Sequence, residues 1–164
     1  DAIELRGVLE GTAARLAAER GADPDALARI QAIVTGLDGC FGDVQGDIDF
    51  NGYSRLNAEF HDALAHLAGS KIVAGELERV KRLPFASPSA FLPDKADMRS
   101  SWRSLGMAQQ QHRDIVAAIA AREGARAEAL AREHARTARR DLEFAIEQNR
   151  SAGAPVVSLA LLVG

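Results

Sequence analysis

Apolar residues recur at three- and four-residue steps along most of this 164-residue chain, the spacing that keeps side chains on one face of a helix. No segment shows the sustained alternation of apolar and polar residues that is typical of a half-buried strand. We therefore expect six helices, at about residues 1–20, 24–41, 52–69, 70–83, 95–122 and 124–151. The sequence predicts an all-α fold, a six- to seven-helix antiparallel bundle.

Glycine and proline mark the ends of these segments. Gly21 ends the first helix, and Asp23-Pro24 is an N-cap followed by a proline at the first helical position. Pro84 stops the fourth helix and begins a stretch to Pro93 with three prolines and two serines. We expect this stretch to be a long irregular connection where a pocket can form. The inward side chains expected in the first helix are Leu5, Val8, Leu9, Thr12, Leu16 and Ala17.

Three histidines, His61, His112 and His134, fall on the apolar stripes of three different expected helices. An imidazole in an apolar core needs partners for both ring nitrogens, so three together indicate a shared cation. Asn57 lies one helical turn before His61, which completes a set of three nitrogens and one oxygen suited to zinc or nickel. The alternative is that each histidine is an ordinary core residue bonded to a backbone carbonyl. His66 lies on another face, where we expect it to be solvated.

Composition limits the function classes open to the chain. The net charge is −3 with acidic and basic residues interspersed, so no basic stripe is present to hold a phosphate backbone. The domain itself is not expected to bind nucleic acid. Its single cysteine, Cys40, has no partner for an internal disulfide, and we expect a cytoplasmic protein. The chain begins at Asp1 in a segment that is already helical in pattern, so we expect a fragment whose N-terminal part is missing.

Four blocks of the sequence resemble a known family. Residues 5–18, LRGVLEGTAARLAA, resemble the opening "LR..LE..AARLAA" of the C-terminal effector-binding (FCD) domain of GntR-type transcriptional regulators of the FadR subfamily. Residues 56–61 (LNAEFH), 111–119 (QHRDIVAAI) and 133–134 (EH) resemble three further motifs of that domain, in the same order. The helix count and residues 151–155 resemble the VanR-like branch, whose named member responds to vanillate.

The resemblance implies a helical bundle with a divalent metal held by Asn57, His61, His112 and His134, and a small carboxylate effector at or beside it. Asn57 replaces the commoner aspartate of the family, which lowers the negative charge facing the cation and should weaken binding. The family also carries an N-terminal winged helix-turn-helix that binds operator DNA as a homodimer. Over residues 1–164 we therefore expect effector binding and dimerisation, with DNA contacts only through the missing domain.

An arginine that pairs with the effector carboxylate completes the expected mechanism. Arg6 is the first candidate, at the edge of the first helix's stripe; its alternative role is a surface pair with Glu10. Arg79 and Arg113 are the further candidates. Effector binding would favour one arrangement of the helices that face the DNA-binding domain, through differential affinity for two states. Loss of operator binding is the usual direction.

Two other functions remain open from the residues alone. A histidine-bound metal could activate water in an enzyme, but the chain has no H-E-x-x-H motif, and Glu59 and Glu133 are expected to point away from the histidine face. The third possibility is a metal-sensing or dimerisation module without an organic effector. The apolar segment from Ala154 to Gly164 is too short to span a bilayer, and we expect it to pack on the bundle or on a partner subunit.

Overall fold

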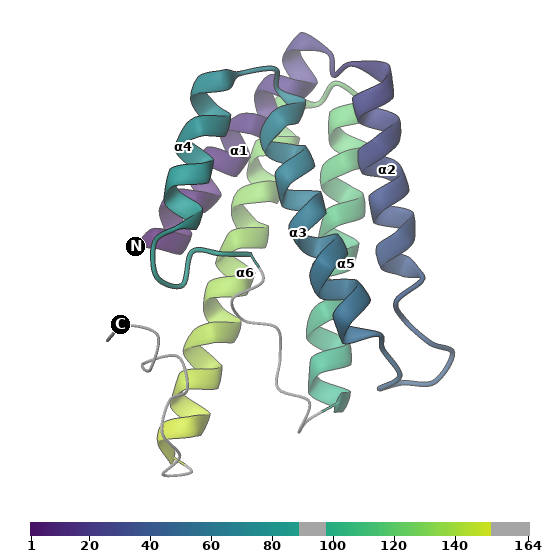
Figure 1. Cartoon of the computed structure of the whole chain (residues 1–164), viewed down its shortest axis with the longest axis vertical. Coiled ribbons are helices and arrows are strands. Elements are labelled where there is room, and N and C mark those ends of the chain that lie inside the picture. Colours follow the sequence, from purple (N-terminus) through teal and green to yellow (C-terminus); the bar gives the residue numbers. More distant parts are fainter. Residues whose placement is uncertain (89–97, 152–164) are drawn as a thin grey trace.

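The computed structural model of the chain describes residues 1–88 and 98–151, which form an all-helical bundle (Figure 1). The helices are α1 (Ala2–Arg20), α2 (Pro24–Asp38), α3 (Phe50–Leu67), α4 (Lys71–Lys81), α5 (Met98–Ala120) and α6 (Gly124–Ser151). Within these ranges the only β pairing is an isolated bridge between Phe41 and Ile48. The predicted all-α class is confirmed. Part of the Pro84–Pro93 connection and the whole of the Ala154–Gly164 segment lie outside the described residues.

Helix ends follow the predicted capping residues. Asp23 accepts a hydrogen bond from the backbone of Ala26 at the start of α2, and Pro24 occupies the first turn. Gly21 ends α1 with a φ of 84°, a conformation that a side chain would strain. The predicted second helix is too long, because α2 ends at Asp38 and the chain turns before reaching Phe41.

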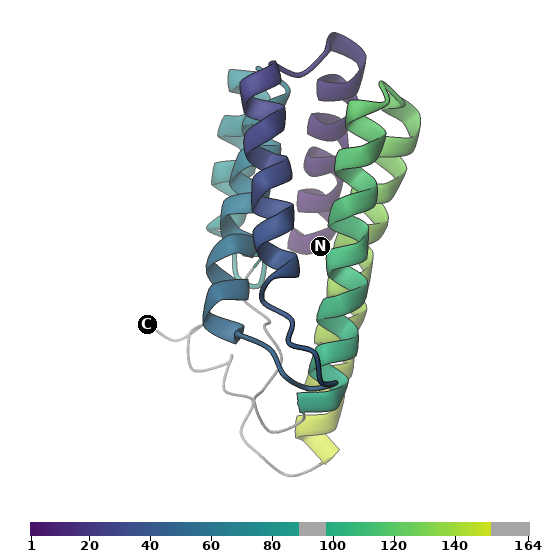
Figure 2. The same cartoon turned by 90° about the vertical axis from the view of Figure 1, so that its right-hand side faces the viewer.

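Helix α1 lies inside the bundle, where it contacts α3, α4, α5 and α6 (Figure 2). Its expected inward face is only partly right. Ala17 is buried and Leu9 and Leu16 pack against the core, but Leu5 is 45% exposed, and the fully buried face consists largely of small and charged residues. The buried residues of α1 are Ile3, Arg6, Gly7, Glu10, Gly11, Ala13, Ala14, Ala17 and Ala18. The reason is a close approach to α6, since a Cβ on Gly7 would lie 2.7 Å from the Cβ of Ala135.

The larger apolar side chains pack between α2, α3, α5 and the buried alanines of α1. Phe60, Leu64, Ile30, Leu37, Ile115 and Ile119 are all essentially inaccessible to solvent. Cys40 is also buried, with its thiol directed at the carbonyl oxygen of Gly36. None of the described helices is long and apolar enough to cross a lipid bilayer.

Candidate metal centre

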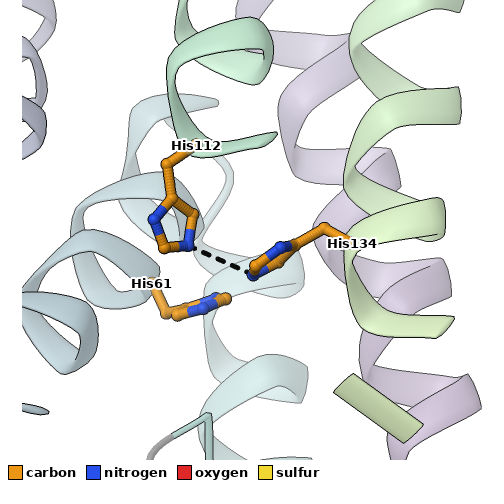
Figure 3. A group of neighbouring side chains, drawn as sticks. All are labelled: His61, His112 and His134. Atoms are coloured by element: carbon orange, nitrogen blue, oxygen red, sulfur yellow. Dashed lines mark hydrogen bonds between the residues drawn. The ribbon is translucent and has the colours of Figure 1, made fainter. Parts of the chain in front are cut away.

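Helices α3, α5 and α6 bring His61, His112 and His134 to one buried point, with one nitrogen of each ring within 4.8 Å of the others. The three side chains are 3%, 0% and 6% exposed. Figure 3 shows the three imidazoles turned toward one another. The remaining histidine, His66, is exposed and its Nδ1 is hydrogen-bonded to the carbonyl of Asp62.

The partner of His112 determines which of its ring nitrogens carries the proton. Its Nδ1 lies 3.0 Å from Oε1 of Gln109. The amide nitrogen of Gln109 donates to the carbonyl of Val34 at 2.9 Å and to the carboxylate of Asp38 at 2.5 Å. The amide oxygen therefore faces the ring and must accept, so Nδ1 of His112 donates its hydrogen. Its Nε2 is left as an unprotonated acceptor.

The same logic applies to His134, whose Nδ1 lies 2.9 Å from Oε1 of Gln111. The amide nitrogen of Gln111 donates to the hydroxyl oxygen of Thr137 at 3.2 Å. That hydroxyl in turn donates to the carbonyl of Glu133 at 3.1 Å, so it is free to accept from Gln111. The oxygen of Gln111 consequently accepts from Nδ1 of His134, and Nε2 of His134 is also left without a hydrogen.

Two acceptors now face each other, because Nε2 of His112 lies 3.2 Å from Nε2 of His134 (Figure 3). Burial, with the charges of His134 and His61, lowers the pKa of His112 well below its ordinary value. Burial and the charge of His61 also lower the pKa of His134, to about 3. Both rings are therefore neutral at pH 7, and a shared cation would satisfy both lone pairs. Two nitrogens on a tetrahedral zinc lie about 3.3 Å apart, since each Zn–N bond is about 2.0–2.1 Å.

The third ring, His61, is held by a carboxylate from α1. Its Nδ1 lies 2.8 Å from Oε1 of Glu10, and both side chains are 2% exposed. Burial alone would raise the pKa of Glu10, but its electrostatic interactions with His61 and Arg6 and its hydrogen bond to His61 outweigh burial and lower the pKa to about 2. Glu10 is therefore a carboxylate at neutral pH that accepts from Nδ1 of His61. Nε2 of His61 is then the nitrogen available at the centre.

Asn57 is buried one turn before His61 on α3. Its amide nitrogen donates to the carbonyl oxygen of Pro88 at 3.3 Å. This bond uses the donor end of the amide and leaves Oδ1 as an acceptor, the atom that a hard or borderline cation would take.

The three candidate arginines lie in different surroundings. Arg6 is 2% exposed, and its guanidinium donates to the carbonyl of Ala86 at 3.0 Å. Its Nε lies 3.7 Å from Oε1 of Glu10, an ion-pair distance too long for a hydrogen bond. The structure does not bring Arg79 or Arg113 to the histidines. Both extend from the outer faces of their helices into water, where Arg79 pairs with Glu76 and Arg113 pairs with Asp38.

Sequence reasoning misses the residues that orient the histidines, Gln109, Gln111 and Glu10. The usable signal for Gln109 is spacing, since a polar residue one turn before a core histidine can reach its Nδ1. Gln111 stands directly before His112 in the sequence but serves His134 on another helix, a pairing that only helix packing reveals. Glu10 is predicted only as a surface partner of Arg6. No comparable signal marks it, because its helix carries no clear apolar stripe on its buried side.

The fold and the site define a helical domain built around an internal cluster of ligand-type side chains. The family model of the FCD domain matches residues 1–137, and the chain belongs to this family. It is therefore a ligand-sensing regulatory domain of the GntR-type transcription regulators, which are generally not enzymes. A comparison with curated proteins gives no match. The FadR subfamily and the VanR-like branch stay predictions.

Proposed function

We propose that the domain binds one divalent cation, zinc or nickel, through Nε2 of His61, His112 and His134 with Oδ1 of Asn57. The observation that carries the proposal is the 3.2 Å contact between two unprotonated Nε2 atoms. In a dry core such a contact is unfavourable unless a proton or a metal lies between the lone pairs. The low pKa values of His112 and His134 disfavour the proton at neutral pH. A metal accounts for the arrangement at physiological pH.

The effector proposed for the same site is a small carboxylate. A bound cation would supply a Lewis-acidic attachment point for one carboxylate oxygen. Arg6 is the residue of this chain proposed to bind the second oxygen or another anionic group. Its guanidinium is buried, and among the described residues its Nε finds no hydrogen-bond acceptor. A buried donor without an acceptor favours an anionic ligand at that position.

Control of DNA binding is proposed to act through the segments that contact Arg6. Arg6 joins α1 to the chain just after α4 through the carbonyl of Ala86. An effector that recruits the guanidinium would weaken this link and favour a different arrangement of α1 and α4. In the intact regulator, this change would alter operator binding by an N-terminal winged helix-turn-helix domain within a homodimer. The effect must come from differential affinity of the effector for the two arrangements.

The test of the cation is the metal content of the purified domain by elemental mass spectrometry. We expect about one divalent ion per chain in the wild type, and its loss in the His112→Ala, His134→Ala double variant. His66→Ala is the matched control, because that histidine is exposed and should leave the metal content unchanged. Absence of metal from the wild type, together with no thermal stabilisation by added zinc or nickel, would overturn the proposal.

The test of the effector follows on the metal-loaded domain. Carboxylic acids are screened by thermal shift on the wild-type domain, with and without a chelator. The same screen is then run on the Arg6→Gln variant. We expect a stabilising acid whose effect needs both the metal and Arg6. Stabilisation that persists in the chelated protein would contradict binding at the metal, and stabilisation that persists in Arg6→Gln would contradict the role of the guanidinium.

A further inference from the structure

The Nδ1 partners of the three histidines differ in charge. His112 and His134 donate to the neutral amides of Gln109 and Gln111, whereas His61 donates to the carboxylate of Glu10. A metal-bound histidine normally donates its other ring hydrogen to such a partner, which fixes the tautomer and raises the basicity of the ligating nitrogen. A carboxylate partner does this more strongly than an amide because its hydrogen bond is charge-assisted.

We infer that Glu10 is a positioning residue for the cation, holding His61 with Nε2 toward the centre and supplying the negative charge that the ligands lack. This inference rests on the proposed cation site. Glu10 is not expected to be a ligand itself, because its carboxylate contacts Nδ1 of His61 and it is not among the residues whose ligand atoms all lie within 4.8 Å of one another. Its role is to orient and polarise a ligand.

The charge of the site supports this role. Three neutral imidazoles and one amide carry no negative charge, so a divalent cation bound by them would be uncompensated in a low-dielectric core. Among the described residues, the only buried members of charged types besides the histidines are Arg6 and Glu10. In the described part of the chain, Glu10 is therefore the one buried carboxylate that could balance the charge of the cation. Asn57 in place of an acidic ligand makes the site depend more on Glu10.

A purely structural alternative is that Glu10 is buried only to neutralise Arg6. The distances favour His61 as its main partner, because Oε1 is 2.8 Å from His61 Nδ1 and 3.7 Å from Arg6 Nε. The hydrogen bond that the guanidinium does make goes to Ala86, at 3.0 Å. Oε2 of Glu10 has no hydrogen-bond partner among the described residues, so this carboxylate is not saturated by the arginine.

The placement of Glu10 follows from the packing of α1. Gly7 and Gly11 flank Glu10 and allow α1 to approach the backbone of α6, where a Cβ on Gly11 would lie 3.1 Å from the carbonyl oxygen of Glu128. Helix α1 also contacts α3, the helix that carries His61. A side chain from the buried face of α1 thus reaches a ring on α3 while α6 supplies another ligand. This closeness places a charged group within hydrogen-bond distance of a ligand without exposing it to water.

The experiment compares Glu10→Gln with Glu19→Gln, which makes the same chemical change at an exposed position of the same helix. The amide of Glu10→Gln keeps the size of the side chain and removes its charge. We expect the zinc affinity, measured by competition with a chromophoric chelator, to fall by about 10- to 100-fold in Glu10→Gln and to stay unchanged in Glu19→Gln. We also expect the visible absorption spectrum of the Co²⁺-loaded Glu10→Gln domain to change, a signature that loss of stability alone would not produce.

Removing Glu10 alone leaves Arg6 as a buried charge without an anion, which can prevent folding. The Arg6→Gln, Glu10→Gln double variant removes both charges and guards against this outcome. The same loss of zinc affinity is expected in it. Zinc affinity and a Co²⁺ spectrum equal to wild type, in either folded variant, would overturn the inference and leave the proposed cation intact. A wild-type domain that binds neither ion would overturn the proposed function and, with it, this role for Glu10.

Discussion

The close packing of α1 against α6 can be tested with a pair of glycines. In Gly7→Ala, the added Cβ would lie 2.7 Å from the Cβ of Ala135, about 1 Å inside an ordinary carbon–carbon contact. Ala135 has no side-chain torsion that could relieve the clash, so one helix must move. Overpacking of this kind costs about 1–3 kcal/mol, and the better helix propensity of alanine returns about 0.5–1 kcal/mol. We expect a net loss of about 1 kcal/mol, and at most about 2.5 kcal/mol, in the free energy of unfolding.

Gly75→Ala is the matched control. Gly75 lies within α4 and is exposed, and a Cβ added there would meet no atom within 4 Å, so only the propensity gain remains. We expect it to stabilise the domain by about 0.5–1 kcal/mol. The assay is urea unfolding followed by circular dichroism, with the chelator-treated protein used throughout so that metal does not contribute.

A rescue variant completes the test. Ala135→Gly removes the methyl group that meets the new Cβ, so Gly7→Ala should cost less in that background than in the wild type. A coupling energy of about 1 kcal/mol between the two positions is expected. Gly7→Ala at least as stable as the wild type, or a cost that Ala135→Gly leaves unchanged, would refute the idea that this contact sets the distance between α1 and α6.

Three other outcomes are expected. Metal-free protein should lose stability as the pH falls below about 6.5, because His112 and His134 take up protons in the unfolded chain but stay neutral in the folded one. The slope should approach about 1.4 kcal/mol per pH unit for each histidine near pH 5. A flat stability profile between pH 7 and 5 would contradict this expectation. Asn57→Asp should tighten zinc binding in the chelator competition by adding a negative ligand, and weaker binding would argue against this side chain as a ligand. Phe60→Ala should cost about 3–5 kcal/mol in urea unfolding, since the ring is fully buried with its centroid 4.1 Å from that of His112; a loss below about 1 kcal/mol would contradict its place in the core.

The helices that carry the histidines are predictable because their burial follows a simple period. Phe60, Leu64 and Ile115 repeat at helical spacing around His61 and His112, so the polar residue within each stripe stands out. The apolar stripe therefore predicts that each histidine lies on the buried face of its own helix. Helix packing then decides whether the three rings meet, and the sequence supports that step only through the resemblance to a family.

Helix α1 is the element whose buried face hydrophobic periodicity predicts incorrectly, and the reason is physical. Hydrophobic periodicity finds the buried face only where burial is provided by large apolar side chains. In α1 the buried face is defined by closeness to α6, which selects Gly7 and Gly11 and leaves larger residues such as Leu5 at the rim. Such a face is predicted better from small residues at four-residue spacing than from hydropathy.

The same close packing links the candidate effector contact to the candidate ligands. Arg6 and Glu10 lie one turn apart on α1, and Glu10 contacts His61. An anion bound by Arg6 would compete with Glu10 for the guanidinium. The negative charge of Glu10 would then be less neutralised by Arg6, and its interaction with His61 would change. Affinity for the effector and affinity for the metal would then be coupled. Because coupling of equilibrium affinities is reciprocal, the factor by which metal strengthens effector binding must equal the factor by which the effector strengthens metal binding.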